Sequence, residues 1–280
     1  MPPLISATLL VRNERENLPL ALRSLEGWVD EVVVVDGEST DGTADVARAF
    51  GAKVFVRPPR GAMEEDGAFA IAQCKGQWVF HLDADEIVPR PLGRKLREAA
   101  QAGAADAFEV HEMSHFLGAP CNVWRGRKLR LFRRGAVDVT DRIHRMHQLR
   151  PGTRLGVMPG GPGMELQHYW IEGIAPLLRQ LDRYTGVEAE QNPPLPRAAK
   201  PRVFLRFARA FLGAYLRDGG IRHGWRGAYL SLHRGFYAAT VEARRAERTL
   251  GGATAIRAQY RREAAALLEQ ESLPTTMTAA

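Results

Sequence analysis

Four consecutive valines, Val32 to Val35, are followed directly by the carboxylate of Asp36. β-Branched residues favour extended strands, and an apolar run without polar alternation is typical of a strand buried on both faces. Strands of that kind occur in parallel sheets that carry helices on either side. The sequence therefore predicts an α/β architecture in which this strand is internal and ends in an acid.

Strands and helices alternate along the first hundred residues. Three further short, β-rich apolar runs predict strands at residues 5–11, 53–56 and 78–82. Apolar residues at helical spacing, Leu18, Leu22 and Leu25, separate the first two strands. A turn-rich segment then leads into a helix over residues 44–50, and we interpret Thr40 and Asp41 there as helix-capping residues. This alternation favours a parallel sheet.

Polar side chains follow three of these strands. They are Asn13, Glu14, Asp36, Asp83 and Asp85. Ligands of open parallel sheets bind outside the carboxyl ends of the strands, so we expect these five residues to converge on one edge. Two carboxylates two residues apart, Asp83 and Asp85, can share a divalent cation that still accepts phosphate oxygens. The pattern indicates a site for a nucleotide diphosphate.

Three motifs in this region resemble those of the family 2 glycosyltransferases, which have a GT-A fold. The motifs are Val11-Arg12-Asn13-Glu14, Asp36-Gly37-Glu38-Ser39-Thr40-Asp41-Gly42-Thr43 and Asp83-Ala84-Asp85-Glu86. The resemblance implies a Rossmann-like, mostly parallel sheet with helices on both faces, plus a helical C-terminal extension. It also implies that Asn13, Glu14 and Asp36 hold the base and ribose of a nucleotide sugar. Asp85 would then ligate Mg²⁺ or Mn²⁺, and Asp83 would contact ribose or the metal.

The later chain resembles the bacterial branch that includes lipopolysaccharide core glucosyltransferases. The resemblance rests on the segment Lys128 to Gly135 (KLRLFRRG) and on His168-Tyr169. It implies a glycolipid acceptor, and it makes His168 a contact to the diphosphate or the metal. A histidine satisfied within the core is the competing interpretation of His168.

Two departures from the family pattern bear on the chemistry. Family members carry a basic residue ahead of the Asp-x-Asp strand, where this chain has Glu65-Asp66-Gly67. The family's base is a Glu in Val-His-Glu-Arg-Val, and we align that motif on residues 139–143, which makes Asp141 the candidate general base. A solvated loop acid is the alternative for Asp141. Other candidate bases are Asp138, Glu109 and Glu112.

Length and composition agree with one large α/β domain plus an appended part. We expect a nucleotide-sugar-binding catalytic domain over residues 1–170, a helical region over 171–271 and a flexible tail over 272–280. The two cysteines give no disulfide framework. A zinc site formed by His144, His147 and His168 is disfavoured, because their spacing matches no compact metal motif. No signal peptide or long uncharged apolar run is evident, and we expect a cytoplasmic protein.

Positive charge is concentrated in the C-terminal half. The chain has a net charge of +7, and residues 197–248 hold twelve Lys or Arg against three acids, interleaved with aromatic residues. Such a segment can lie on an anionic membrane surface at the inner face of the cytoplasmic membrane. Packing of amphipathic helices on the catalytic domain with solvated arginines is the simpler alternative, and nucleic-acid binding is disfavoured.

The sequence as a whole predicts an inverting, metal-dependent glycosyltransferase that uses a nucleotide diphosphate sugar, with uridine as the expected base, and a bacterial envelope glycolipid. A nucleotidyltransferase would share the sheet but would open with a Gly-rich loop, which residues 12–17 lack. A non-catalytic membrane-surface or nucleic-acid-binding protein would explain the basic segment and leave the acidic strand ends without a function.

Overall fold

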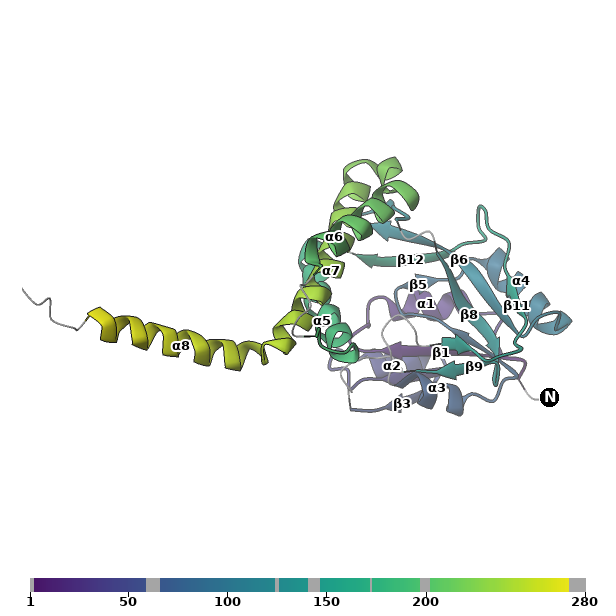
Figure 1. The fold of residues 1–280 in the computed structure, drawn as a ribbon. Helices are drawn as coiled ribbons and strands as arrows, with labels where there is room; N and C mark the ends of the chain where they lie inside the picture. The colour runs from purple at the N-terminus through teal and green to yellow at the C-terminus, as the bar shows by residue number, and fades with distance from the viewer. Residues whose placement is uncertain are drawn as a thin grey trace, which may run out of the picture.

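The structure, a computed structural model, describes residues 3–58, 66–123, 126–140, 147–171, 173–196 and 202–271. A large mixed sheet lies at its centre, with strand order β3-β2-β1-β4-β8-β6-β12-β5 (Figure 1). The strands on this path are β1 Ile5–Val11, β2 Glu31–Asp36, β3 Lys53–Val56, β4 Trp78–His81, β5 Glu86–Ile87, β6 Ala107–Phe116, β8 Arg127–Arg133 and β12 Leu166–Ile171. Short strands β7 (Ala119–Pro120) and β11 (Leu155–Val157) pair with β6. Strands β9 (Val137–Val139) and β10 (His147–Leu149) form a separate antiparallel pair.

The first half of the sheet is parallel, as the sequence predicts. Strand β1 pairs in parallel with both β2 and β4, and β2 pairs in parallel with β3. The second half is mixed, because β8 runs antiparallel between β4 and β6. Strand β12 then pairs in parallel with β6 and antiparallel with β5. The predicted α/β class is confirmed, and the insertion of β8 brings its side chains next to the end of β4.

Helices cover both faces of the sheet, and strand alternation sorts the core between them. On one face, Trp78 and Phe80 of β4 pack with α1 (Leu18–Leu25), α2 (Thr43–Ala49) and α4 (Arg90–Ala102). On the other face, Val79 packs with residues next to α3 (Gly67–Gln73) and with Val137 of β9. Successive side chains of a strand point to opposite faces, which explains this division.

The second part of the chain is helical. Its elements are α5 Ile174–Gln191, α6 Val203–Leu212, the π-helix η2 Gly213–Arg217, the 3₁₀ helix η3 Gly220–His223, α7 Gly224–Thr249 and α8 Gly252–Glu271. Phe116 at the end of β6 packs in one apolar cluster with Leu177 of α5, Ala214 and Leu230, which anchors this region to the sheet. Helix α5 ends where Pro193 and Pro194 follow, at the break that the sequence predicts. Helix α8 projects away from the body (Figure 1). Within the described residues, no helix combines the length and apolarity needed to cross a bilayer.

Close packing between α4 and Trp28 makes Gly93 sensitive to substitution. A Cβ atom at Gly93 would lie 2.7 Å from Cδ1 of Trp28. The Trp28 ring cannot retreat, because it packs edge-on against Phe80 with centroids 4.9 Å apart and donates a hydrogen bond to the Ser24 carbonyl. Overpacking lowers the free energy of unfolding by about 1–3 kcal/mol, and the higher helix propensity of alanine offsets at most about 1 kcal/mol of that loss.

We therefore expect Gly93→Ala to lower the free energy of unfolding by about 1–2 kcal/mol in urea titrations. Gly135→Ala is the matched control, because a Cβ there meets no heavy atom within 4 Å. A Gly93→Ala protein as stable as the control would show that the core accommodates the extra methyl group.

Candidate active site

The loops that follow β1 and β2 are joined by hydrogen bonds at the carboxyl edge of the sheet. Asn13 has a φ of 55°, in the left-handed region that non-glycine residues rarely adopt. Its backbone N–H donates to Ser39 Oγ at 2.8 Å, and its Oδ1 accepts from the Thr40 N–H at 2.9 Å. The Glu14 N–H donates to Thr43 Oγ1 at 2.8 Å. Asn13 and Glu14 therefore lie at the predicted edge, with Asn13 also joining the two loops.

Asp41 has a structural role in the same loop. Its Oδ1 accepts from the Thr43 N–H at 3.0 Å, at the first turn of α2, and its Oδ2 accepts from the Arg15 N–H at 3.1 Å. Gly42, with a φ of 91°, occupies the formal cap position. Asp41 thus satisfies an N–H of the first turn from one residue ahead of the cap.

Asp36, at the end of β2, is buried, and only one of its two carboxylate oxygens is satisfied. Oδ1 accepts from the Ser39 N–H at 2.8 Å. Oδ2 is buried and has no hydrogen-bond partner among the described residues. A buried acceptor without a donor is costly, and a bound molecule could supply that donor.

Asp66, one of the residues that departs from the family pattern, is neutralised by a basic residue from the neighbouring strand end. Arg57 Nε lies 2.9 Å from Asp66 Oδ1, and the Asp66 side chain is almost fully buried. The Arg57 N–H also donates to the Asp36 carbonyl at 2.8 Å, which holds the two residues side by side. Glu65 lies outside the described residues. Arg57 thus balances the acid that departs from the family pattern.

The turn after β4 holds Asp83 between two basic side chains. Asp83 Oδ2 lies 2.8 Å from Arg130 Nη2, and its Oδ1 lies 3.3 Å from His81 Nε2. Desolvation favours the neutral acid, but Arg130 and His81 outweigh it and hold the pKa of Asp83 well below its usual range. Asp83 is therefore ionised at neutral pH.

Asp85 contacts His168, which lies on β12, far from Asp85 in the sequence. The antiparallel register of β12 and β5 pairs His168 with Glu86 and sets its ring beside the turn. His168 Nε2 lies 3.4 Å from Asp85 Oδ2, and its Nδ1 lies 3.2 Å from Glu112 Oε1. Burial alone would lower the pKa of His168, but these two carboxylates raise it to about 10. The structure thus brings together two residues that the sequence assigns to the metal or diphosphate.

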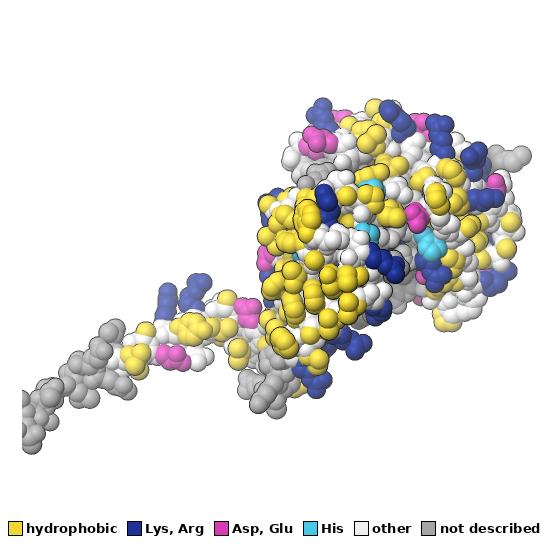
Figure 2. All heavy atoms as spheres, turned by 90° about the horizontal axis from the view of Figure 1, so that it is seen from above, with side chains coloured by type: hydrophobic (Ala, Val, Ile, Leu, Met, Phe, Trp, Pro, Cys, Tyr) yellow, Lys and Arg dark blue, Asp and Glu magenta, His cyan; other side chains and the backbone are white. Residues whose placement is uncertain are grey.

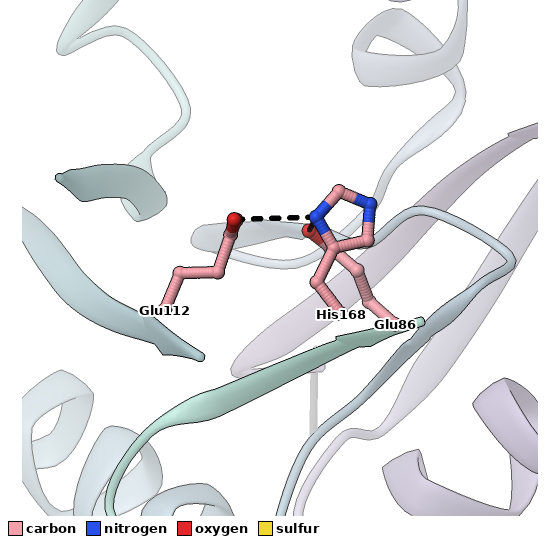
Figure 3. Close-up of side chains that lie close together, drawn as sticks. All are labelled: Glu86, Glu112 and His168. Atoms are coloured by element: carbon pink, nitrogen blue, oxygen red, sulfur yellow. Dashed lines mark ion pairs between the residues drawn. The ribbon is translucent and has the colours of Figure 1, made fainter. Parts of the chain in front are cut away.

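Beneath Asp85 lies a buried network of charges, part of which is drawn in Figure 3. Glu86, Glu112 and His168 present three ligand-type atoms within 4.8 Å of one another, an arrangement that could also hold a metal ion. However, Arg130 Nη2 contacts Glu86, and Lys128 Nζ contacts Glu112 and lies 3.5 Å from Glu86. The two cations already balance these carboxylates, so we interpret this network as support for the Asp83-Ala84-Asp85 turn.

The pKa values of the two buried glutamates are shifted in opposite directions. Burial, together with the neighbouring Asp83, raises the pKa of Glu86 despite Arg130. Burial also opposes ionisation of Glu112, but His168 and Lys128 hold the pKa of that carboxyl far below its usual value. Glu112, one of the candidate bases, is therefore already paired and a poor proton acceptor at neutral pH.

Other predicted acids lie apart from this cluster or outside the described residues. Glu109 pairs with Arg127 at 3.1 Å, and the exposed Asp138 pairs with Arg150 at 2.8 Å. Asp141 and His144 lie outside the described residues. His147 packs against the His81 ring, with centroids 5.2 Å apart, and burial lowers its pKa to about 2. A neutral His147 packed on His81 and a His168 bound to two carboxylates give no common zinc site.

Sequence reasoning missed the two basic residues of β8. Lys128 and Arg130 are two residues apart on one strand and so share a face. Leu129 lies between them and Leu131 follows Arg130, so the two leucines lie on the opposite face. Alternation of cations with leucines indicates only that the two cations share one face of a strand, and such a face is ordinarily exposed to solvent. Only the fold reveals that their partners are Asp83, Glu86 and Glu112.

Comparison with known proteins identifies the class to which this fold and site belong. The family model for glycosyl transferase family 2 matches residues 6–149, about half of the chain. The chain therefore belongs to glycosyl transferase family 2, as its three motifs predict.

Individual relatives are similar to this chain over different parts of its length. An uncharacterized glycosyltransferase of Rickettsia felis is 41% identical over 109 residues, which cover 39% of this chain and 38% of that protein. This chain thus matches only about two fifths of the length of such Rickettsia relatives. The lipopolysaccharide core biosynthesis glycosyltransferase LpsC of Rhizobium meliloti is 28% identical over 254 residues, covering 86% of this chain and 91% of LpsC.

A solved structure is also similar. Glucosyl-3-phosphoglycerate synthase from Mycobacterium tuberculosis, in complex with Mn²⁺, uridine diphosphate and glucosyl-3-phosphoglycerate, is 28% identical, with a TM-score of 0.32. The match covers 41% of this chain and 44% of that one.

Replacing Arg130 tests how much its buried ion pairs contribute to the stability of the fold. Arg130→Met leaves the fully buried Glu86 and the Asp83 carboxylate without their shared cation. Breaking a buried ion pair on one side costs about 3–5 kcal/mol, so we expect a loss of that size in the free energy of unfolding from urea titrations.

Arg127→Met on the same strand is the control, because its ion pair with Glu109 is partly exposed to solvent and such pairs contribute at most about 1 kcal/mol. Equal losses in the two variants would contradict the assignment of Arg130 as the central cation.

Proposed function

We propose that this protein transfers a sugar from a nucleotide diphosphate sugar to an acceptor hydroxyl with inversion at the anomeric carbon, and that a divalent metal ion assists. The observation that carries the proposal is the pairing of Asp85 with His168, next to the ionised Asp83, at the carboxyl edge of the sheet. Family membership limits the chemistry to which this cluster can belong. Asp36 contributes a second anchoring point on the same edge.

The residues present fit a Mg²⁺ or Mn²⁺ ion. Asp85 Oδ2 is a carboxylate oxygen, a ligand type that suits both Mg²⁺ and Mn²⁺. His168 Nε2, 3.4 Å away, could add an imidazole nitrogen once it has given up its proton. The Asp85 side chain is partly exposed, which leaves room for phosphate oxygens beside it. Once bound, the metal ion would neutralise the developing charge of the departing diphosphate as a Lewis acid.

The chain's own residues would position the donor. The unsatisfied Oδ2 of Asp36 would accept a hydrogen bond from the base or ribose, and Asn13 and Glu14 line the same edge. Uridine is the base that we propose. His168, whose pKa of about 10 keeps its proton at neutral pH in the metal-free protein, would contact either the diphosphate or the metal.

The transfer also requires a base on the acceptor side. As the acceptor oxygen attacks the anomeric carbon, the bond from that carbon to the diphosphate breaks and the hydroxyl proton must be removed. We propose that Asp141 accepts this proton, on the basis of the motif register at residues 139–143. The pairing of Glu112 with Lys128 and His168 supports this choice over Glu112.

We propose a bacterial envelope glycolipid, such as lipopolysaccharide core, as the acceptor. The similarity to LpsC, a lipopolysaccharide core biosynthesis glycosyltransferase, extends over most of both chains and supports this class. The Lys128 to Gly135 segment and His168-Tyr169 support it independently. Such an acceptor is anchored in a bilayer, so the enzyme would work at the inner face of the cytoplasmic membrane.

Metal-dependent donor binding tests the proposal. In a thermal-shift panel of nucleoside diphosphates and their sugars, we expect a uridine diphosphate compound to raise the Tm only when Mn²⁺ is present, because a ligand that binds the folded state stabilises it by mass action. Asp85→Ala should abolish the Mn²⁺-dependent part of the shift and leave the Tm of the free protein nearly unchanged.

Asp45→Ala, which removes a highly exposed acid of α2, is the control and should retain the full shift. Undiminished Mn²⁺-dependent stabilisation of the Asp85→Ala protein would refute the metal site. Turnover of a nucleoside triphosphate with release of pyrophosphate would instead indicate a nucleotidyltransferase.

Asp141→Asn tests the proposed base, because asparagine keeps the size of the side chain but cannot accept the proton. We expect kcat to fall by about 10²–10⁴, the usual contribution of general base catalysis, while donor affinity in the thermal-shift assay stays constant. Asp138→Asn, three residues earlier, should change kcat little. A loss of only a few-fold in the Asp141→Asn enzyme would exclude Asp141 as the base.

A further inference from the structure

Helix α6 presents apolar side chains to solvent along its length. Its residues alternate between apolar and basic types with helical periodicity, yet none of its side chains is fully buried. Phe204 is 83% exposed and Leu205 is 59% exposed, and Leu212, seven residues after Leu205, lies on the same stripe as Leu205. Soluble proteins seldom expose aromatic and leucine side chains so fully in one cluster, so this stripe indicates a contact surface.

The exposed stripe is distinct from the side of α6 that packs on α7. Phe207 and Phe211 lie against Gly235 of α7, where an added Cβ would come within 2.8 Å of the Phe207 ring. Phe207 also packs edge-on against Phe236, with centroids 5.3 Å apart. Since α6 already has this internal packing face, the outer stripe requires a separate explanation.

The stripe continues into the elements that follow α6. Leu216 of η2, Ile221 of η3 and Trp225 of α7 are all more than half exposed. Figure 2 shows a broad gathering of apolar side chains over the helical region, on the face seen from above. We call the surface formed by Phe204, Leu205, Leu212, Leu216, Ile221 and Trp225 the apolar tip.

Positive charge surrounds the apolar tip. Residues 202–226 contain six arginines and a single acid, Asp218. That acid is already paired with Arg217 and with Arg234 of α7. Exposed apolar side chains bordered by arginines match a bilayer with anionic headgroups, which takes the apolar groups into the headgroup and acyl boundary and the arginines onto phosphates.

The apolar tip lies close to the candidate active site. The Trp225 ring is 6.4 Å from that of Phe116, at the end of β6. Glu112 of the buried charge network lies four residues earlier on the same strand, which corresponds to about 13 Å at 3.3 Å per residue. A membrane that contacts the tip would thus lie within reach of the Asp83-Ala84-Asp85 turn for a headgroup several sugars long.

We infer that the apolar tip inserts into the surface of an anionic lipid bilayer and holds the catalytic domain beside it. The inference identifies a lipid-binding surface on α6, η2, η3 and the start of α7. Helix α8 is not the principal contact, because its three arginines are matched by three glutamates. It does not depend on the proposed reaction, because binding to a bilayer requires neither donor nor acceptor.

Cosedimentation of the full chain with vesicles tests the inference. Vesicles of phosphatidylcholine with 30% phosphatidylglycerol should bind the protein, pure phosphatidylcholine should bind it weakly, and added salt should weaken binding because it screens the arginines. The double variant Phe204→Ser/Leu205→Ser should lower the partition coefficient at least tenfold. Burial of even one such side chain accounts for about that factor.

The control is Tyr260→Ser/Leu267→Ser on α8, which also replaces an exposed aromatic residue and an exposed leucine and should leave vesicle binding unchanged. Both variants should keep the wild-type Tm. Equal losses in the two variants, or no vesicle binding by the wild type, would overturn the inference. A wild-type dimer in light scattering that dissociates in the Phe204→Ser/Leu205→Ser variant, without vesicle binding, would assign the tip to a second copy of the chain and also overturn it.

Discussion

The buried guanidinium of Arg130 joins the parts from which the candidate site is built. It lies between Asp83 of the turn and Glu86 of β5, and it is supplied by β8, the antiparallel strand between β4 and β6. Two carboxylates brought this close would repel each other and draw protons without a fixed cation between them. One arginine therefore keeps Asp83 ionised and ties together Asp83 and Glu86, the two residues on either side of Ala84 and Asp85. The geometry proposed for metal binding depends on this contact more than on any feature of β4 itself.

His168 extends the same principle across the sheet. It reaches the turn because β12 pairs with β5, and its ring links Asp85 at the surface to Glu112 in the interior. The ring orientation is thus determined from both sides, which is how histidines near metal sites are commonly oriented. A side chain held from both sides has little conformational freedom left to lose if a metal ion or diphosphate binds.

The parallel half of the fold could be predicted from sequence because its signals are local. The valine run of β2, the leucine spacing of α1 and the polar residues at the strand ends each lie within a few residues of the structure they specify. The placement of β8 could not be predicted, since it depends on pairing between segments about fifty residues apart. The same limit hid the partners of Lys128 and Arg130. The unsatisfied oxygen of Asp36 could not be predicted either. A motif specifies residue types, but it does not show which of their oxygens accept hydrogen bonds in the folded protein.

Helix α8 differs from the rest of the molecule in how it unfolds. At 1.5 Å per residue its 20 residues extend about 30 Å from the body, and almost all of its described side chains are exposed. A helix of this length without a packed face has little stability of its own in water. Its amide hydrogens should therefore exchange with solvent by local unfolding, at a rate set by helix propensity. The amide hydrogens of β1 and β4 should exchange only when the whole domain unfolds. The chain thus contains two regions that respond separately to denaturant, and only one of them contains the candidate site.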